Sequence, residues 1–248
     1  MNGTPYDRQF FKQLSEGSYR SATNIVPILM ELFRPRSVID VGCGIGTWLR
    51  AFRENGVMEI TGIDGPYVEA SDLLIPIDTF LKADLSRPLN LSKRSDLAVC
   101  LEVAEHLPAK TSAGLVSTLC SISDIIVFSA AIPQQPGTDH INCRWQSYWA
   151  DFFASEGYGA FDIVRPLIRG NDEIDWWYQQ NIIVFIKLAN ENARRFPRSA
   201  NKSLDLVHPT LYLHNSYHSL GLKSMMRLML TKLDTVARRG VAGWHKGV

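Results

Sequence analysis

The sequence predicts an α/β protein built on an open, doubly wound and mostly parallel sheet of about seven strands. Short, nearly continuous apolar runs alternate with longer segments whose apolar residues recur at helical spacing. This alternation is typical of parallel strands covered by helices on both faces. The chain has 248 residues, of which 46% are hydrophobic and 21% charged. It is therefore long enough to bury a substantial core.

The expected elements follow one another in a regular order. Residues 6–33 read as one or two helices, which Pro35 ends. Strands are expected at residues 37–42, 58–64, 79–85, 96–102, 124–132, 160–168 and 181–188. Helices are expected at residues 46–56, 113–122 and 145–157, the first and last of them closed by Gly56 and Gly157.

These elements divide the chain into three parts. Residues 1–36 are expected to form a helical lid, residues 37–188 the sheet domain, and residues 189–248 a helical extension. From Lys187 onward there are 11 Lys and Arg against 3 Asp and Glu, which leaves residues 1–186 with a balance of −7. An acidic body thus precedes a basic tail.

The sequence favours a cytoplasmic location. No segment approaches the roughly 20 continuous apolar residues of a membrane span, and the N-terminus lacks the apolar run of a signal peptide. The four cysteines are scattered without a C-x-x-C pair. We therefore expect reduced thiols rather than disulfides or a zinc knuckle.

A glycine-rich stretch directly follows the first expected strand. Gly42, Gly44 and Gly46 allow a tight turn and a close approach of ligand to main chain. Their G-x-G-x-G spacing departs from the G-x-G-x-x-G pattern of dinucleotide-binding proteins. Asp40 adds negative charge beside this turn. The stretch therefore favours a ligand with a cationic group over an anionic one.

Two further acids follow the next strands, and ligands in such sheets bind at the carboxyl ends of the strands. Asp64 ends the second strand, where a carboxylate can accept both hydroxyls of a ribose. Asp84 follows the third and can accept a hydrogen bond from the exocyclic amine of adenine. A ligand with an amine, a ribose and an adenine, and without phosphate, is S-adenosylmethionine.

Four motifs in order resemble those of the class I S-adenosylmethionine-dependent methyltransferases: "DVGCGIG", "GID", "ADL" and "LEVAEHL". The resemblance covers residues 37–188. It implies that Gly42 and Gly44 approach the methionine part of the cofactor, while Asp40 supports its ammonium group through the loop. It also implies that Asp64 holds the ribose and Asp84 the adenine, with Leu85 offering a main-chain N–H. Glu102 would flank the sulfonium.

A catalytic base is needed only where the acceptor keeps its proton at neutral pH. His140 is the first candidate, since it lies after the fifth strand and an imidazole titrates near neutrality; the alternative is a structural role in its loop. Glu105 and His106, after the fourth strand, are the second pair, and they could instead support the pocket. Cys143 stands where related sequences would carry Glu. We expect no metal, because no i, i+4 ligand pair or dense carboxylate set is present; the alternative is a metal site built from Asp139, His140, Glu105 and His106.

Aromatic and polar residues mark an expected acceptor side. Trp and Tyr faces pack on sugar rings and other flat groups, although aromatic stripes more often belong to the core. An acidic acceptor could contact Arg20. The candidates are Tyr19, Arg20, Asn142, Trp145, Trp176 and Trp177.

The resulting prediction is an enzyme that transfers a methyl group to oxygen or nitrogen of a small molecule or glycan. An NAD-dependent oxidoreductase is the leading enzyme alternative, and a non-catalytic S-adenosylmethionine-binding scaffold is the other. A nucleic-acid substrate is disfavoured by the acidic body.

The basic tail contains one amphipathic stripe between Leu222 and Ala237. Such a helix has to bury its apolar face. It could pack on the acidic body or on a second subunit in a homodimer, or dock peripherally on the anionic inner membrane surface.

Overall fold

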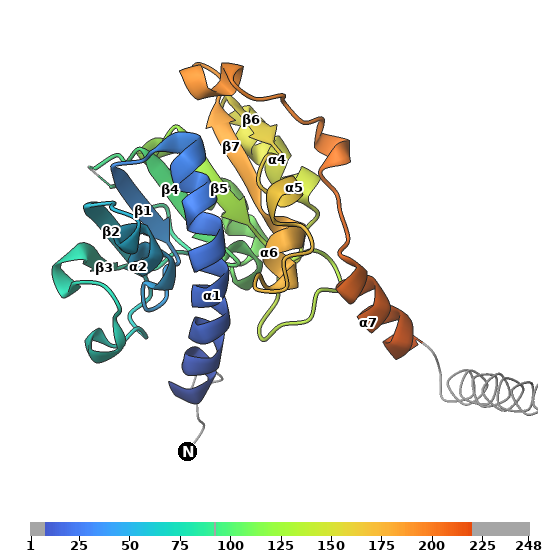
Figure 1. Cartoon of the computed structure of the whole chain (residues 1–248), viewed down its shortest axis with the longest axis horizontal. Coiled ribbons are helices and arrows are strands. Elements are labelled where there is room, and N and C mark those ends of the chain that lie inside the picture. The colour runs from blue at the N-terminus through green and yellow to red at the C-terminus, as the bar shows by residue number, and fades with distance from the viewer. Residues whose placement is uncertain (1–7, 92, 220–248) are drawn as a thin grey trace, which may run out of the picture. The chain divides into compact units, whose positions relative to one another are not determined.

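A computed structural model describes residues 8–91 and 93–219 of the chain. One seven-stranded sheet has the strand order β3-β2-β1-β4-β5-β7-β6 (Figure 1). The strands are β1 (Ser37–Val41), β2 (Glu59–Asp64), β3 (Phe80–Lys82), β4 (Leu97–Leu101), β5 (Ile125–Ser129), β6 (Tyr158–Phe161) and β7 (Ile183–Lys187). The predicted doubly wound sheet and its number of strands are confirmed.

The sheet is mixed because its last strand reverses direction. β1 pairs in parallel with β2 and β4, and the parallel pairing continues to β3 and β5. β7 lies antiparallel to both β5 and β6. The order runs outward from β1 in both directions, so the loops after β1 and β4 diverge at the carboxyl edge. Such a reversal point is where open α/β sheets bind ligands.

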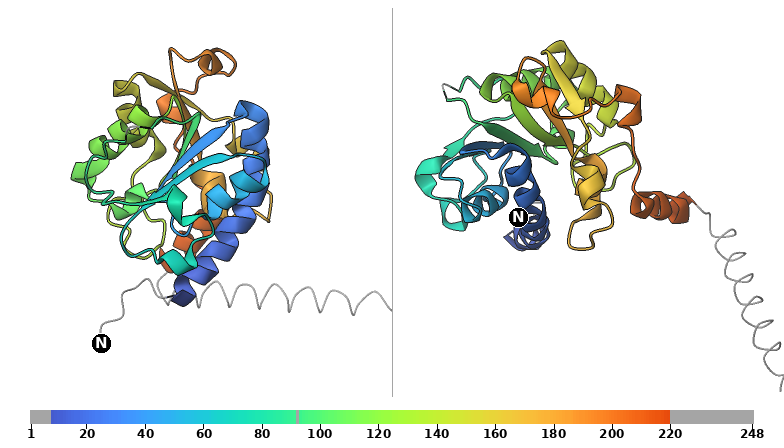
Figure 2. Two further views of the ribbon diagram at one scale, coloured as in Figure 1. Left: turned by 90° about the vertical axis from the view of Figure 1, so that its left-hand side faces the viewer. Right: turned by 45° about the horizontal axis from the view of Figure 1, so that its top comes forward.

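The α-helices before β7 are α1 (Arg8–Phe33), α2 (Thr47–Glu54), α3 (Ser112–Ile122), α4 (Gln146–Ser155), α5 (Arg165–Ile168) and α6 (Trp176–Asn181). The left view of Figure 2 shows α1 on one face of the sheet and α3 and α4 on the other. Strand residues alternate between two buried clusters, as in β4, where Val99 faces the α1 side and Cys100 the α3 side. Both faces are therefore covered, which explains the nearly continuous apolar runs.

Helix α1 is anchored in the core through its second half. Ala22, Ile25, Val26 and Leu29 are fully buried in the same cluster as the α1-side strand residues. Their i, i+3, i+4 spacing puts one stripe of the helix against the sheet. The second half of α1, which belongs to the predicted lid segment at residues 1–36, is thus packed into the core of the sheet domain.

The region before β7 differs from the expected elements. Residues 160–168 were expected to form one strand, but β6 ends at Phe161 and Arg165–Ile168 form the short helix α5. The buried Arg165 explains the break, because its guanidinium donates to both carboxylate oxygens of Asp162 and to the main-chain oxygens of Gln180 and Leu204. Helix α6 was not expected either, and its buried end carries the polar side chains of Gln180 and Asn181.

The chain forms two compact units, residues 1–206 and residues 207–248. The first continues past the predicted boundary at residue 188 through short 3₁₀ turns at Glu191–Arg194 and Asn201–Ser203. In the second, the described part holds α7 (Pro209–Ser219). The predicted amphipathic stripe at residues 222–237 lies outside the described residues. Within the described ranges, every helix is too short or too polar to cross a bilayer.

Candidate active site

A cavity of about 610 Å³ opens at the carboxyl edge of the sheet. Its lining comes from the segments that follow β1, β2, β3 and β4, together with α1 and α6. The strand order places those segments side by side along the edge of the sheet. The order there is Asp84, Asp64, the glycine loop (residues 42–46), Glu102 and His106. The volume lies within the roughly 300–1,000 Å³ of small-molecule and cofactor pockets.

The glycine loop is tightly constrained at its first residue. Gly42 has φ 85°, and a Cβ built there would lie 2.3 Å from Cγ2 of Val103. Only glycine meets both conditions without strain. The main chain at Gly42 and Gly44 lines the cavity as predicted. Gly46, the third glycine, is not among the described residues of the lining.

Asp64 fastens the glycine loop to β2. Its Oδ2 accepts a hydrogen bond from the Gly44 N–H at 2.6 Å, and its Oδ1 accepts one from the Gly65 N–H at 2.6 Å. The Tyr67 hydroxyl also donates to Oδ1. A carboxylate offers about four lone-pair sites. Three donors from the protein therefore leave room for about one more, fewer than the two ribose hydroxyls expected from the sequence.

The remaining predicted cofactor residues differ in their exposure. Asp84 is exposed at the cavity and accepts from the Ser86 N–H and hydroxyl at 3.0 and 2.6 Å, which lower its pKa. Leu85 beside it lines the cavity and is half-buried. Asp40 is 3% exposed and, among the described residues, does not line the cavity. Burial, with Asp64 nearby, raises the pKa of Asp40 well above its usual range.

Glu102 is held in place by a buried amide network. Its φ of 54° is unusual for a residue with a side chain. Its carboxylate accepts from Gln135 Nε2 at 2.9 Å and from Asn181 Nδ2 at 3.0 Å. Gln180 Nε2 donates in turn to Gln135 Oε1 at 3.0 Å. This network orients Glu102 at the cavity wall, and sequence spacing offered no sign of it because its members come from three distant segments.

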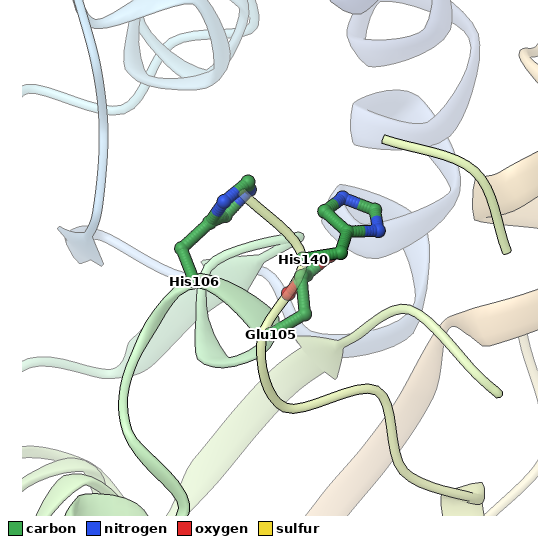
Figure 3. Close-up of side chains that lie close together, drawn as sticks. All are labelled: Glu105, His106 and His140. Carbon is green, nitrogen blue, oxygen red and sulfur yellow. The ribbon is translucent and has the colours of Figure 1, made fainter. Parts of the chain in front are cut away.

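The predicted catalytic residues Glu105, His106 and His140 lie together (Figure 3). Each offers one ligand-type atom, and these atoms all lie within 4.8 Å of one another. His106 also lines the cavity. Nδ1 of His140 lies 3.3 Å from the main-chain oxygen of Gln135. With a proton on Nδ1 for this bond, the lone pair of His140 is on Nε2.

Burial sets the protonation of this cluster. Desolvation, reinforced by the neighbouring Glu102 charge, raises the pKa of Glu105 well above its usual range. Burial and the adjacent His140 lower the pKa of His106, and burial lowers that of His140. Both imidazoles are therefore neutral at pH 7 and can each offer a lone pair to a proton or another cation.

One wall of the cavity is aromatic, and neither of its rings was among the predicted site residues. The rings of Trp48 and Tyr178 pack edge to face with centroids 5.2 Å apart, and both line the cavity. Ser18 of α1 lies within hydrogen-bonding distance of the Tyr178 hydroxyl, at 3.4 Å. Tyr178 directly follows Trp176 and Trp177, which were predicted to bind the acceptor. Only the turn of α6 decides which of these rings faces the cavity.

Asn142, predicted to bind the acceptor, is instead an interior residue. It is 2% exposed. Its Nδ2 donates to the main-chain oxygen of Ala104 and to Ser112 Oγ, and its Oδ1 accepts from Arg144. Asn142 therefore anchors the loop that carries His140 and does not reach an acceptor.

The other predicted acceptor residues lie outside the described lining of the cavity. The Tyr19 hydroxyl donates to Glu54 at 2.6 Å, and Arg20 pairs with Asp175 at 3.4 Å. Trp145 is 40% exposed at the start of α4. Trp176 and Trp177 contact each other edge to face, and Trp177 packs on the core.

Comparison with known proteins agrees with this geometry. The family described as a methyltransferase domain matches residues 10–161, more than half of the chain. No curated protein matches the chain significantly.

Three solved structures share the fold at low sequence identity. Magnesium protoporphyrin IX methyltransferase from Synechocystis PCC 6803, with bound S-adenosylmethionine, is 17% identical, with TM-score 0.50 over 75% of this chain and 86% of its own. An O-methyltransferase family protein from Burkholderia thailandensis is 15% identical, with TM-score 0.52 over 73% and 60%. The methyltransferase domain of bacterial CtHen1-C is 16% identical, with TM-score 0.50 over 68% and 98%.

The motif order, the cavity at the sheet's reversal point and the family match over residues 10–161 agree. This chain belongs to the methyltransferase-domain family and is an S-adenosylmethionine-dependent class I methyltransferase.

Proposed function

We propose that this enzyme methylates an oxygen or nitrogen atom of a small molecule or glycan, and that the acceptor meets the cofactor beside Glu105, His106 and His140. The observation that carries this proposal is that the cofactor-type acids and the polar cluster share one cavity: Asp64, Asp84 and His106 all line it.

The residues present fit S-adenosylmethionine. The cavity is large enough, at about 610 Å³, and its main chain is exposed at Gly42 and Gly44. Asp64 retains about one lone-pair site for a hydroxyl. Trp48, Leu101 and Tyr178 supply apolar surface in the lining. Donors, acceptors and volume thus match a nucleoside with an amino-acid tail and no phosphate.

The cofactor supplies a methyl group already activated by its sulfonium. The protein therefore has to align the acceptor and exclude water. Gly42 and Gly44 form the floor that the ligand touches, and Asp64 keeps that floor fixed to β2. Trp48 and Tyr178 cover one side of the cavity with apolar surface.

An acceptor that keeps its proton needs a group to activate it, and the cluster provides one. Two neutral imidazoles lie beside Glu105, and the amide network holds Glu102 next to Glu105. General acid–base assistance of this kind contributes about 100- to 10,000-fold in rate. An amine acceptor that is already neutral would not require it.

The proposal is tested by incubating the full chain with methyl-labelled S-adenosylmethionine and pools of hydroxylated and amino acceptors. Label transfer together with release of S-adenosylhomocysteine is expected for at least one pool. Tight cofactor binding without transfer to any pool would favour the scaffold alternative. Binding of NADH with no binding of S-adenosylmethionine would overturn the proposal.

A further inference from the structure

Glu105, His106 and His140 form a compact donor set at the edge of the cofactor cavity. They come from two segments: Glu105 and His106 end the 3₁₀ turn Ala104–His106 after β4, and His140 lies in the loop after β5. Figure 3 shows the three side chains close together, carried by these two segments. Sequence spacing predicted no metal, because the two histidines share no helix turn.

The loop that carries His140 is tied to the turn that carries the other two ligands. The main-chain oxygen of Glu105 accepts hydrogen bonds from the N–H groups of Ile141 and Asn142, both at 2.9 Å. Asn142 adds a bond from its side chain to the main-chain oxygen of Ala104 at 3.3 Å. The three donors are therefore brought together by the backbone and not by a chance arrangement of side chains.

Two atoms of the cluster are buried without a hydrogen-bond partner. Glu105 is fully buried; its Oε1 accepts from the Ala131 N–H at 3.1 Å, its Oε2 has no N–H donor within hydrogen-bonding distance, and its carboxyl group lies beside that of Glu102. Nδ1 of His106 is buried and has no partner either. Leaving such groups unsatisfied destabilises the folded state. A cation between them would satisfy both.

The chemistry and spacing of the donors suit a divalent transition metal. Two imidazoles with one carboxylate are a donor set for zinc, manganese, iron and cobalt. In a tetrahedral site, ligand atoms about 2.1 Å from the metal lie about 3.4 Å apart. The observed spacing, within 4.8 Å, is that of an open site, and binding the cation has to draw the side chains inward by up to about 1.4 Å at the widest pair.

We propose that Glu105, His106 and His140 bind one divalent transition-metal cation, and that this cation binds a hydroxyl oxygen of the methyl acceptor. The proposal rests on the proposed function and narrows its acceptor to a hydroxyl compound. A bound cation lowers the pKa of a coordinated hydroxyl. The hydroxyl proton passes to solvent water. The new O–C bond forms as the sulfur–methyl bond breaks, which gives a methyl ether, S-adenosylhomocysteine and one released proton.

The binding test uses the full chain after treatment with EDTA and removal of the chelator. Co²⁺ is added first, because its visible absorption reports nitrogen and oxygen ligands, and Zn²⁺ and Mn²⁺ are titrated by calorimetry. We expect one saturable site per chain. His140→Ala should weaken Co²⁺ binding at least about 100-fold, because even groups that only orient a ligand contribute about 10- to 100-fold.

Two further variants make the test specific. His214→Ala removes an exposed imidazole outside the cluster and should leave Co²⁺ affinity unchanged. Glu105→Gln keeps the shape of the buried side chain and should also abolish tight binding; if it does not fold, His140→Ala still decides, since His140 is only half-buried.

Cofactor affinity is measured on the same samples. If wild-type protein binds S-adenosylmethionine but no Co²⁺, Zn²⁺ or Mn²⁺, the metal site is refuted while the proposed function stands. Equal Co²⁺ affinity in wild type and His140→Ala refutes it as well. If the protein binds metal at the cluster but no S-adenosylmethionine, the proposed function fails and the metal site remains.

Discussion

The imidazole rings of His106 and His140 pack edge to face, with centroids 5.0 Å apart and planes at 76°, although the two residues follow different strands. The contact exists because β4 and β5 are adjacent and parallel, so that the loops after them leave the same edge of the sheet. The contact joins His106, which lines the cavity, to the loop of His140, which is not among the described residues of the lining.

Asp64→Ala should weaken binding of both S-adenosylmethionine and S-adenosylhomocysteine. The change removes an acceptor for the cofactor and also the bond that fixes Gly44. Losing a hydrogen bond to a charged group costs about 1.5–3 kcal/mol, or roughly 10- to 150-fold in Kd. Calorimetry measures both affinities. Asp78→Ala, which removes an exposed carboxylate outside the cavity lining, is the control, and equal affinities in the two variants would remove Asp64 from the site.

Tyr67→Phe should tighten cofactor binding by about 3- to 10-fold, the equivalent of one ordinary hydrogen bond. Its hydroxyl donates to Asp64 and takes one of the lone-pair sites that a ribose hydroxyl could use. The gain should vanish when the same change is made in Asp64→Ala, which calorimetry on the four proteins tests. Weaker binding by Tyr67→Phe would mean that the hydroxyl contacts the cofactor itself.

Gly137→Ala should lower turnover about tenfold or more without changing cofactor affinity, because general acid–base groups contribute at least about 100-fold when well placed. A Cβ at residue 137 would lie 2.1 Å from Nε2 of His140, so the imidazole has to move. Steady-state rates and calorimetry separate the two effects. Gly114→Ala, whose Cβ would meet its nearest neighbour at an ordinary 3.5 Å, should leave both unchanged. Normal turnover in Gly137→Ala would show that the position of His140 does not matter.

Asp40→Asn should stabilise the fold near pH 8 by about 1–3 kcal/mol, because it removes a buried charge while keeping a side chain of nearly the same shape. Burial raises the pKa of Asp40, so protonation favours the folded state. The corresponding stability is present below the usual carboxyl pKa and is lost as pH rises through the raised pKa. Asparagine does not titrate, so the advantage should shrink as pH falls.

Thermal melts of wild type and Asp40→Asn between pH 4 and pH 8 test this dependence, within roughly the range where carboxyl groups titrate. Asp72→Asn replaces a less buried carboxylate and should give parallel curves. If the charge also supports the cofactor's ammonium, Asp40→Asn will bind S-adenosylmethionine more weakly despite its higher stability. A melting point below wild type at pH 8 would contradict the argument.

Local sequence pattern was sufficient for much of the fold. The apolar runs of β1, β4, β5 and β7 are buried on both faces, so each reads as a strand without reference to its neighbours. The turn after β1 needs a positive φ and no side chain at Gly42, and that requirement is also local. The acids at the ends of β2 and β3 could be placed because parallel strands bring their carboxyl ends to one edge.

Long-range contacts decided what local pattern could not. Arg165 ended a run that reads as strand, because its buried guanidinium needed the main-chain oxygens of Gln180 and Leu204. Asn142 was predicted to bind the acceptor, yet its side-chain amide donates hydrogen bonds to Ala104 and Ser112. Tyr178, and not the two tryptophans before it, faces the cavity because α6 turns that side inward.

The sequence by itself determined the class of fold, the carboxyl edge as the site and the type of cofactor, since each depends on residues within a few positions of a strand end. Only the tertiary structure decided how Asp64 divides its lone pairs between Gly44, Gly65 and Tyr67, and that His140 meets Glu105 and His106. The reason is physical. Side-chain period and turn chemistry act over neighbouring residues, whereas a donor set is closed by hydrogen bonds between loops that the sheet alone brings together.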